Sequence, residues 1–86
     1  MGETGMKVRV LLFARLRELA SRDALELDLP EGSTVGEVWR RLQETVEGLR
    51  AYAPPPLMAI DQAYASPDVV LRGGEEVAFF PPVSGG

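Results

Sequence analysis

The feature that most constrains the fold is a single amphipathic helix pattern in the middle of the chain. Its apolar residues recur every three or four positions, a spacing that places side chains on one face of a helix. They are Val35, Val38, Trp39, Leu42, Val46 and Leu49. Thr34 and Glu37 stand three positions apart as a capping box, which predicts the start of the helix. Gly48 is the predicted stop, and we predict that Trp39 lies in the core.

Segments typical of β-strands flank this helix on both sides. In the first segment, Val8, Val10 and Leu12 alternate with residues of a second face, and this period of two indicates a strand. Strands are expected over residues 8–13, 25–29, 57–61 and 77–80, with a short helix over residues 14–20. Residues 63–70 are expected to be irregular, because Pro67 and Asp68 favour a turn.

This order of elements predicts one α+β domain. The first and last strands can be central neighbours in a sheet, because residues 8, 10 and 12 and residues 77 and 79 form apolar faces. The long helix and the short one would cover a mixed sheet of four to five strands, which is the outline of the β-grasp, or ubiquitin-like, fold. We expect a flexible lead-in over residues 1–5, the β-grasp domain over residues 6–82 and an extended tail over residues 83–86.

The composition argues against several classes of function. The 86 residues include no histidine and no cysteine, so the chain lacks the usual near-neutral bases, thiol nucleophiles and metal-ligand sets. We therefore expect it to bind no metal and no cofactor. Its net charge of −4 argues against nucleic acid as a partner, since phosphate binding requires a basic surface. No apolar run approaches the roughly 20 residues of a membrane span, and no signal segment opens the chain. We expect a cytoplasmic protein with no membrane partner.

The chain ends in Gly85 and Gly86, which makes the terminal carboxylate a candidate reactive group. Pro81 and Pro82 favour an extended tail that leaves the domain, because proline restricts its own backbone and that of the residue before it. The four residues that follow can reach roughly 14 Å, and glycine lets a narrow channel close around the backbone. The carboxylate must first be activated, for example by adenylation with ATP, and another protein must supply that catalysis. The alternative is a frayed tail without function.

Aromatic side chains form a second candidate site at the base of the tail. Leu11 and Phe13 share the outer face of the first strand, and Phe80 alternates with the inward-facing Phe79 on the last strand. If the two strands are neighbours, Phe13 and Phe80 lie together on the outer face of the sheet, and Tyr64 can extend the patch. Such a patch is a candidate protein interface. The alternative is additional core packing under a loop.

Two motifs near opposite ends of the chain are similar to those of a known family. One is Phe-Ala-Arg-Leu-Arg-Glu-Leu at residues 13–19, and the other is Val-Ala-Phe-Phe-Pro-Pro-Val-Ser-Gly-Gly at residues 77–86. Together they resemble the small subunit of molybdopterin synthase (the MoaD family), and the resemblance runs from about Met6 to Gly86. Asp61, which precedes Gln62, departs from the family pattern, where Asn is expected. The departure concerns a local turn or polar contact.

The resemblance implies a sulfur carrier that is not an enzyme on its own. A ubiquitin-activating-like adenylyltransferase would use ATP to adenylate Gly86, which would then become a thiocarboxylate. The tail would insert into the large subunit of molybdopterin synthase, in a heterotetramer whose catalytic residues lie on that large subunit. There it would donate sulfur to cyclic pyranopterin monophosphate and form the molybdopterin dithiolene, a step of molybdenum cofactor biosynthesis. The residues expected to bind partners are Phe13, Arg17, Tyr64, Phe80, Pro81, Pro82, Val83 and Ser84.

Other functions share the fold and the Gly-Gly ending, so the tail alone leaves them open. They include a sulfur carrier for thiamine, tRNA thiolation or cysteine synthesis, and a ubiquitin-like modifier joined to lysines through Gly86. A plain interaction module is a further alternative. The motif at residues 13–18 and the segment at residues 79–84 favour the molybdopterin synthase subunit.

Overall fold

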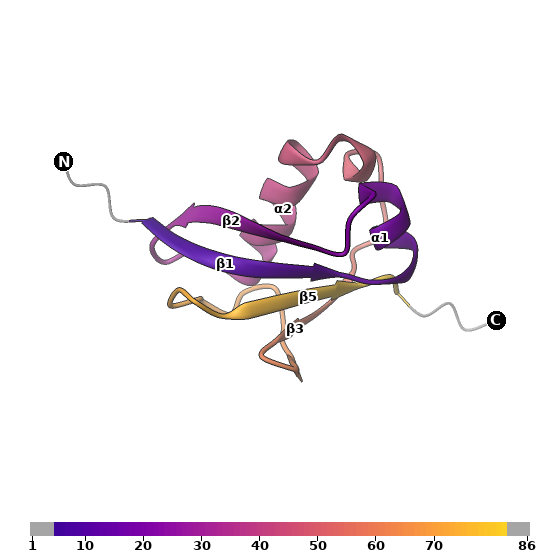
Figure 1. Cartoon of the computed structure of the whole chain (residues 1–86). Helices are drawn as coiled ribbons and strands as arrows, with labels where there is room; N and C mark the ends of the chain where they lie inside the picture. Colours follow the sequence, from indigo (N-terminus) through magenta and orange to yellow (C-terminus); the bar gives the residue numbers. More distant parts are fainter. Residues whose placement is uncertain (1–4, 83–86) are drawn as a thin grey trace.

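The computed structural model describes residues 5–82 of the chain (Figure 1). Its elements are β1 (Gly5–Leu12), α1 (Ala14–Ala20), β2 (Ala24–Pro30), α2 (Val35–Thr45), the short 3-10 helix η1 (Glu47–Leu49), β3 (Leu57–Ile60), β4 (Ala63–Tyr64) and β5 (Glu76–Phe80). The predicted tail over residues 83–86 lies outside the described residues, as do residues 1–4 of the predicted lead-in. Gly5, the last residue of that lead-in, already belongs to β1.

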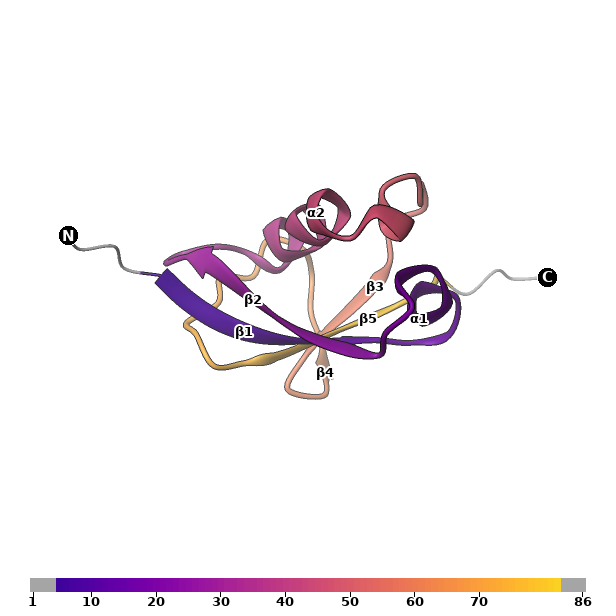
Figure 2. The same cartoon turned by 45° about the horizontal axis from the view of Figure 1, so that its top comes forward.

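The five strands form one mixed sheet in the order β2-β1-β5-β3-β4. The two strands closest to the chain ends in sequence, β1 and β5, are parallel neighbours near its centre, while β2, β3 and β4 pair antiparallel. Figures 1 and 2 show α2 on one side of the sheet, which leaves the opposite side of β1, β5 and β3 without a covering helix. The predicted mixed sheet, with the first and last strands as neighbours, is confirmed.

The core lies between α2 and the inner face of the sheet. Val8, Val10 and Val77 are fully buried there, as alternation along β1 and β5 requires. Trp39 is also buried, with its ring centroid 5.3 Å from that of Phe79, so its predicted place in the core is confirmed. Alternate side chains of β1 and β5 are thus buried under α2, and the side chains between them lie on the outer face of the sheet.

The start of α2 follows the prediction, but its end does not. The Thr34 hydroxyl accepts the Glu37 N–H at 3.2 Å, and the Glu37 carboxylate accepts the Thr34 N–H at 2.8 Å, which completes the capping box. The helix stops at Thr45, because Val46 adopts an extended backbone, so the prediction of a stop at Gly48 is wrong. Gly48 has a different role: a Cβ atom there would overlap the backbone carbonyl oxygen of Leu19. The residue allows η1 to pack directly against α1.

The segment over residues 63–70, expected to be irregular, contains the two-residue strand β4. The backbone turns between β3 and β4 at Asp61 and Gln62, whose φ angles are 47° and 74°. Two residues with positive φ are typical of the tight turn that joins hairpin strands. The hairpin is so short that its sequence carries too few alternating residues to indicate a strand.

Within residues 5–82, no helix is long and apolar enough to cross a membrane. Within the same residues, no group of three or more acidic side chains is arranged so that it could hold a metal ion.

Candidate functional site

Phe13 and Phe80 form a stacked pair on the outer face of the sheet. Their ring centroids are 4.7 Å apart and the ring planes differ by 7°. The pairing follows from the register of the parallel strands, in which Leu12 lies opposite Phe79. Phe80 and Phe13, the residue with extended backbone that follows β1, therefore reach the other face. The Phe13 N–H also donates to the Phe79 carbonyl oxygen at 3.3 Å, which continues the pairing of the two segments beyond the end of β1. The predicted juxtaposition of the two rings is confirmed, and their role in partner binding stays a prediction.

Tyr64 extends this aromatic pair, as predicted. Its ring meets that of Phe80 edge to face, with centroids 6.4 Å apart, and 78% of the residue is exposed. A large aromatic side chain with so little burial contributes little to the core, which favours a role at the surface. We call the cluster formed by the exposed Phe13 and Tyr64 and the half-buried Phe80 the aromatic patch.

The turn before Tyr64 is held by Asp61, at the position where the resemblance implies Asn. The Asp61 N–H donates to the Glu76 carbonyl oxygen at 2.8 Å, and the Asp61 carboxylate accepts the Glu76 N–H at 3.0 Å. Asp and Asn both tolerate the left-handed backbone of this position and both offer a side-chain oxygen. The turn and its polar contact are therefore formed with Asp61 in place.

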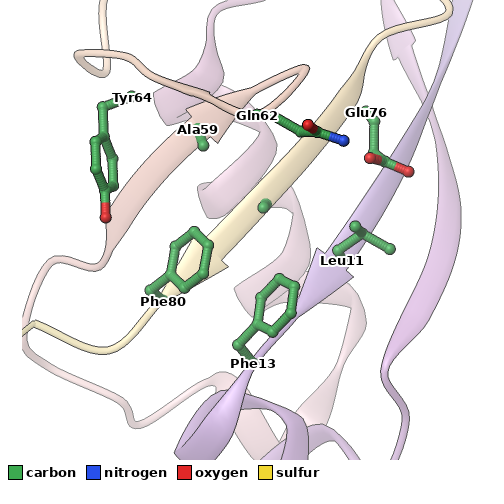
Figure 3. Close-up of a pocket in the computed structure, with 8 residues that line it drawn as sticks. Leu11, Phe13, Ala59, Gln62, Tyr64, Glu76 and Phe80 are labelled. Atoms are coloured by element: carbon green, nitrogen blue, oxygen red, sulfur yellow. The ribbon is translucent and has the colours of Figure 1, made fainter.

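Beside the aromatic patch, the outer face of the sheet forms an open hollow of about 360 Å³. Its lining residues come from β1 and the residue after it, from β5 and from the β3–β4 hairpin: Leu11, Phe13, Ala59, Gln62, Tyr64, Glu76, Ala78 and Phe80. Figure 3 shows the rings of Phe13 and Phe80 at one end and the polar ends of Gln62 and Glu76 at the other. The hollow is thus apolar towards the end of β5 and polar towards its start.

Charged residues continue the outer face beyond the polar end of the hollow. Arg9 lies 3.7 Å from Glu76, and Lys7 lies 3.6 Å from Asp28 and 3.9 Å from Glu26. All five side chains are substantially exposed, so these pairs contribute little to stability. Their position divides the outer face into a charged half and an apolar half, and the apolar half adjoins the end of β5.

The remaining predicted partner-binding residues lie around the same end of the sheet. Arg17 is exposed on α1 and lines a second hollow, of about 300 Å³, together with Phe13. Pro81 is half-buried and Pro82 is exposed directly after β5. The predicted residues Val83, Ser84, Gly85 and Gly86 lie outside the described residues. The structure thus brings the described part of the predicted site together where the tail begins.

Four residues of the hollow were missed by sequence reasoning, namely Ala59, Gln62, Glu76 and Ala78. Ala59 and Ala78 carry no chemistry that singles them out in a sequence. The only available signal was their small size within segments otherwise rich in large apolar residues. Gln62 and Glu76 gave no signal, because isolated polar residues at the ends of strands are common.

The turn that leads into β5 is organised by the carboxylate of Glu75. It accepts the N–H groups of Arg72 at 2.8 Å and Gly73 at 2.7 Å, while the Gly74 N–H donates to the Lys7 carbonyl oxygen at 2.8 Å. Partial burial opposes ionisation of Glu75, but the N–H groups of Arg72 and Gly73 outweigh it and lower the pKa of this carboxyl. In the loop after β4, the Ser66 hydroxyl donates a hydrogen bond to the Asp68 carboxylate and lowers the pKa of that carboxyl.

Replacing Glu75 with Gln is expected to lower the free energy of unfolding by about 1 kcal/mol near neutral pH, because Gln keeps one acceptor oxygen where the carboxylate has two. The pKa of Glu75 is lower in the folded chain than its ordinary value of 4.5. The contribution of Glu75 is therefore present above about pH 4.5 and is lost as the pH falls through the lowered pKa. Urea unfolding of both proteins at several pH values measures this.

The stability difference between the two proteins should shrink steadily as the pH is lowered below about 4.5. A difference that stays constant across the acidic range would show that ionised Glu75 does not stabilise the turn. Glu31→Gln, at an exposed residue after β2, provides a control with the same change of charge.

The chain is similar in sequence and in structure to several known proteins. The model of the ThiS family matches residues 10–86. The molybdopterin synthase sulfur carrier subunit of Mycobacterium tuberculosis is 37% identical, and the match covers 94% of this chain and 99% of that protein. Among solved structures, a putative molybdopterin converting factor subunit 1 from Pyrococcus furiosus is 32% identical, with a TM-score of 0.79 over 91% of this chain and 99% of that one. SAMP1 from Haloferax volcanii is 26% identical, with a TM-score of 0.81 over 93% of this chain and 99% of that one. The β-grasp class predicted from the sequence is confirmed.

Proposed function

This chain belongs to the ThiS family, and on that premise we propose that it is the sulfur carrier subunit of a molybdopterin synthase, with Gly86 as the residue that carries the sulfur. The relatives that bear this name match nearly the whole chain. The observation that supports the proposal most is the position of the aromatic patch. It lies on the outer face of the sheet at the end of β5, immediately before Pro81, Pro82 and the tail.

The chemistry follows from the ending of the chain. One oxygen of the Gly86 carboxylate attacks the α-phosphorus of ATP on an activating adenylyltransferase, which forms an acyl adenylate and releases pyrophosphate. Hydrosulfide, delivered by the sulfur donor, then attacks the acyl carbon, displaces AMP and loses its proton, which leaves a thiocarboxylate. An ordinary carboxylate is ionised above a pKa of about 3.5 and is a poor electrophile, so the adenylation step is required. The ATP belongs to the activating enzyme, and this chain binds no cofactor in the proposal.

The synthase step divides the work between two proteins. The aromatic patch docks on the large subunit of molybdopterin synthase, in a heterotetramer, and the tail enters the active site of that subunit. There the thiocarboxylate delivers its sulfur to cyclic pyranopterin monophosphate, and the dithiolene of molybdopterin is built. The catalytic residues belong to the large subunit, because this chain has no histidine and no cysteine. We place this reaction in the cytoplasm.

The proposal is tested by the intact mass of the chain after incubation with the activating enzyme, ATP and a sulfur donor. We expect a mass increase equal to the replacement of one oxygen by one sulfur, located at Gly86 by fragmentation. The reaction without ATP is the control and should leave the mass unchanged. If the complete reaction also leaves the mass unchanged, every sulfur-carrier version of the proposal is excluded.

A protein modifier is the second candidate function. It is favoured by the similarity to SAMP1 from Haloferax volcanii, which is named a small archaeal modifier protein. In that case Gly86 would form an isopeptide bond with lysine side chains. Peptide mapping of cell extracts distinguishes the two functions, because only the modifier leaves the C-terminal peptide of this chain on lysines of other proteins. After trypsin, which cleaves last at Arg72, that peptide is residues 73–86.

A further inference from the structure

Two alanines occupy the centre of the outer sheet face. Ala78 of β5 lies opposite Leu11 of β1 on one side and opposite Ala59 of β3 on the other. Alanine is a weak strand former, and central strands favour β-branched and aromatic residues. With two adjacent alanines in the middle of the sheet, the domain is expected to be less stable than with larger residues at these two positions.

These alanines are buried, but they lie outside the core cluster under α2. Ala59 is 5% exposed and Ala78 is 9% exposed, yet neither is a member of the core cluster under α2. Both line the hollow on the opposite face. They are shielded from solvent because larger side chains stand around them, among them Leu11, Tyr64 and Phe80. The alanines form the floor of the hollow and the larger side chains form its walls.

The lining of the hollow restricts what can occupy it. The floor and most of the wall present carbon, and the charged group at the polar end is the Glu76 carboxylate. Among the residues that line the hollow in the described part of the chain, none is basic, and Arg9, which lies beside the polar end, is paired with Glu76 at 3.7 Å. The lining itself therefore offers no positive charge to an acidic group. Burying a charge without a partner is costly, whereas an apolar side chain would gain the usual stabilisation from burial.

We propose that the hollow floored by Ala59 and Ala78 receives one bulky apolar side chain from the protein partner that docks at the base of the tail. The inference rests on the proposed function and names a specificity-determining part of its docking surface. The hollow shares Phe13, Tyr64 and Phe80 with the aromatic patch, so a partner that covers the patch also covers the hollow. The small size of the two alanines keeps the place for that side chain free.

Filling the hollow from the floor tests this directly. Ala78→Leu is expected to weaken binding to the large subunit of molybdopterin synthase at least about 10-fold in isothermal titration calorimetry, because the added side chain occupies the space of the partner's. Ala78→Val, a smaller and β-branched residue, is expected to weaken binding less. The melting temperature of the Val variant should be unchanged or higher, since valine favours strands. Weaker binding together with unimpaired stability is a result that a purely structural role cannot produce.

Ala63→Val is the matched control. Ala63 is exposed in β4, and it pairs with Ile60 while Tyr64 pairs with Ala59, so its side chain lies on the face away from the hollow. This variant should bind the large subunit as the unaltered chain does. If Ala78→Leu folds poorly, Ala78→Val alone decides the question.

The outcomes separate this inference from the proposed function. If the Ala78 variants bind the large subunit with unaltered affinity and sulfur is still transferred to Gly86, the hollow does not receive a side chain of the partner. The proposed function as a sulfur carrier would be unaffected by that result. Failure of the unaltered chain to bind the large subunit would overturn both. Self-association of the unaltered chain that Ala78→Leu abolishes, in sedimentation velocity, would show that a second copy occupies the hollow and would overturn the proposed occupant.

Discussion

Removing Gly85 and Gly86 is expected to abolish sulfur transfer while the folded domain remains intact. The core cluster between α2 and the sheet is formed by residues between Met6 and Phe79, so we expect the domain to fold without the last two residues of the chain. The proposed chemistry, in contrast, requires a terminal carboxylate on a backbone narrow enough for a closed channel. The truncated chain ends on Ser84, whose carboxylate would lie about two residues, or roughly 7 Å, short of the reacting position.

The measurement is molybdopterin formation from cyclic pyranopterin monophosphate by the reconstituted synthase, with the activating enzyme, ATP and a sulfur donor present. A chain extended by one alanine after Gly86 is the matched control, because it keeps both glycines but moves the carboxylate. It should be equally inactive, with the same melting temperature as the unaltered chain. Sulfur transfer by either variant would contradict the assignment of Gly86 as the carrier.

Replacing Phe80 with Asp is expected to weaken binding to the large subunit about 100-fold and to leave the fold in place. Phe80 is the centre of the aromatic patch, since both Phe13 and Tyr64 contact its ring. Central aromatic residues of an interface commonly contribute 2 kcal/mol or more, about 30-fold in affinity. An aspartate at this position would in addition place an unpaired charge in the apolar half of the interface. Because the ring lies on the outer face, its loss creates no cavity in the core.

Isothermal titration calorimetry with the large subunit measures the affinity, and circular dichroism checks the fold. Val70→Asp is the matched control, because Val70 is an exposed apolar residue, 59% accessible, that does not line the hollow. This control should retain full affinity. Unchanged affinity of the Phe80 variant would remove Phe80 from the interface and with it the main support for docking at the base of the tail.

The parts of the fold that were predictable depend on interactions between near neighbours in the sequence. The start of α2 is an example, because both hydrogen bonds of its capping box join Thr34 and Glu37. The end of the same helix was not predictable, since Gly48 is required by the carbonyl of Leu19, a residue on another helix. The β4 strand was missed for a similar reason. Its turn is held by contacts between Asp61 and Glu76, which are 15 residues apart.

The candidate site also has a part that could be predicted from the sequence and a part that could not. Alternation along two strands was sufficient to place Phe13 and Phe80 on the outer face, and the sheet order then brought their rings together. The hollow could not be predicted, because it depends on the size of side chains that meet only through the register of β1, β3 and β5. Alanine has no distinctive chemistry, so its significance at residues 59 and 78 appears only from its neighbours.

The amino-acid sequence by itself determined the β-grasp class, the inner and outer faces of the strands and the candidate reactive terminus at Gly86. These follow from periodicity, capping and the chemistry of single residues, all of which act over short stretches of chain. Only the tertiary structure decided that the outer face has an apolar half at the end of β5 and a charged half beyond it, with a hollow floored by Ala59 and Ala78. The physical reason is that the shape and polarity of a surface arise from side chains on different strands, whose distances are set by strand pairing.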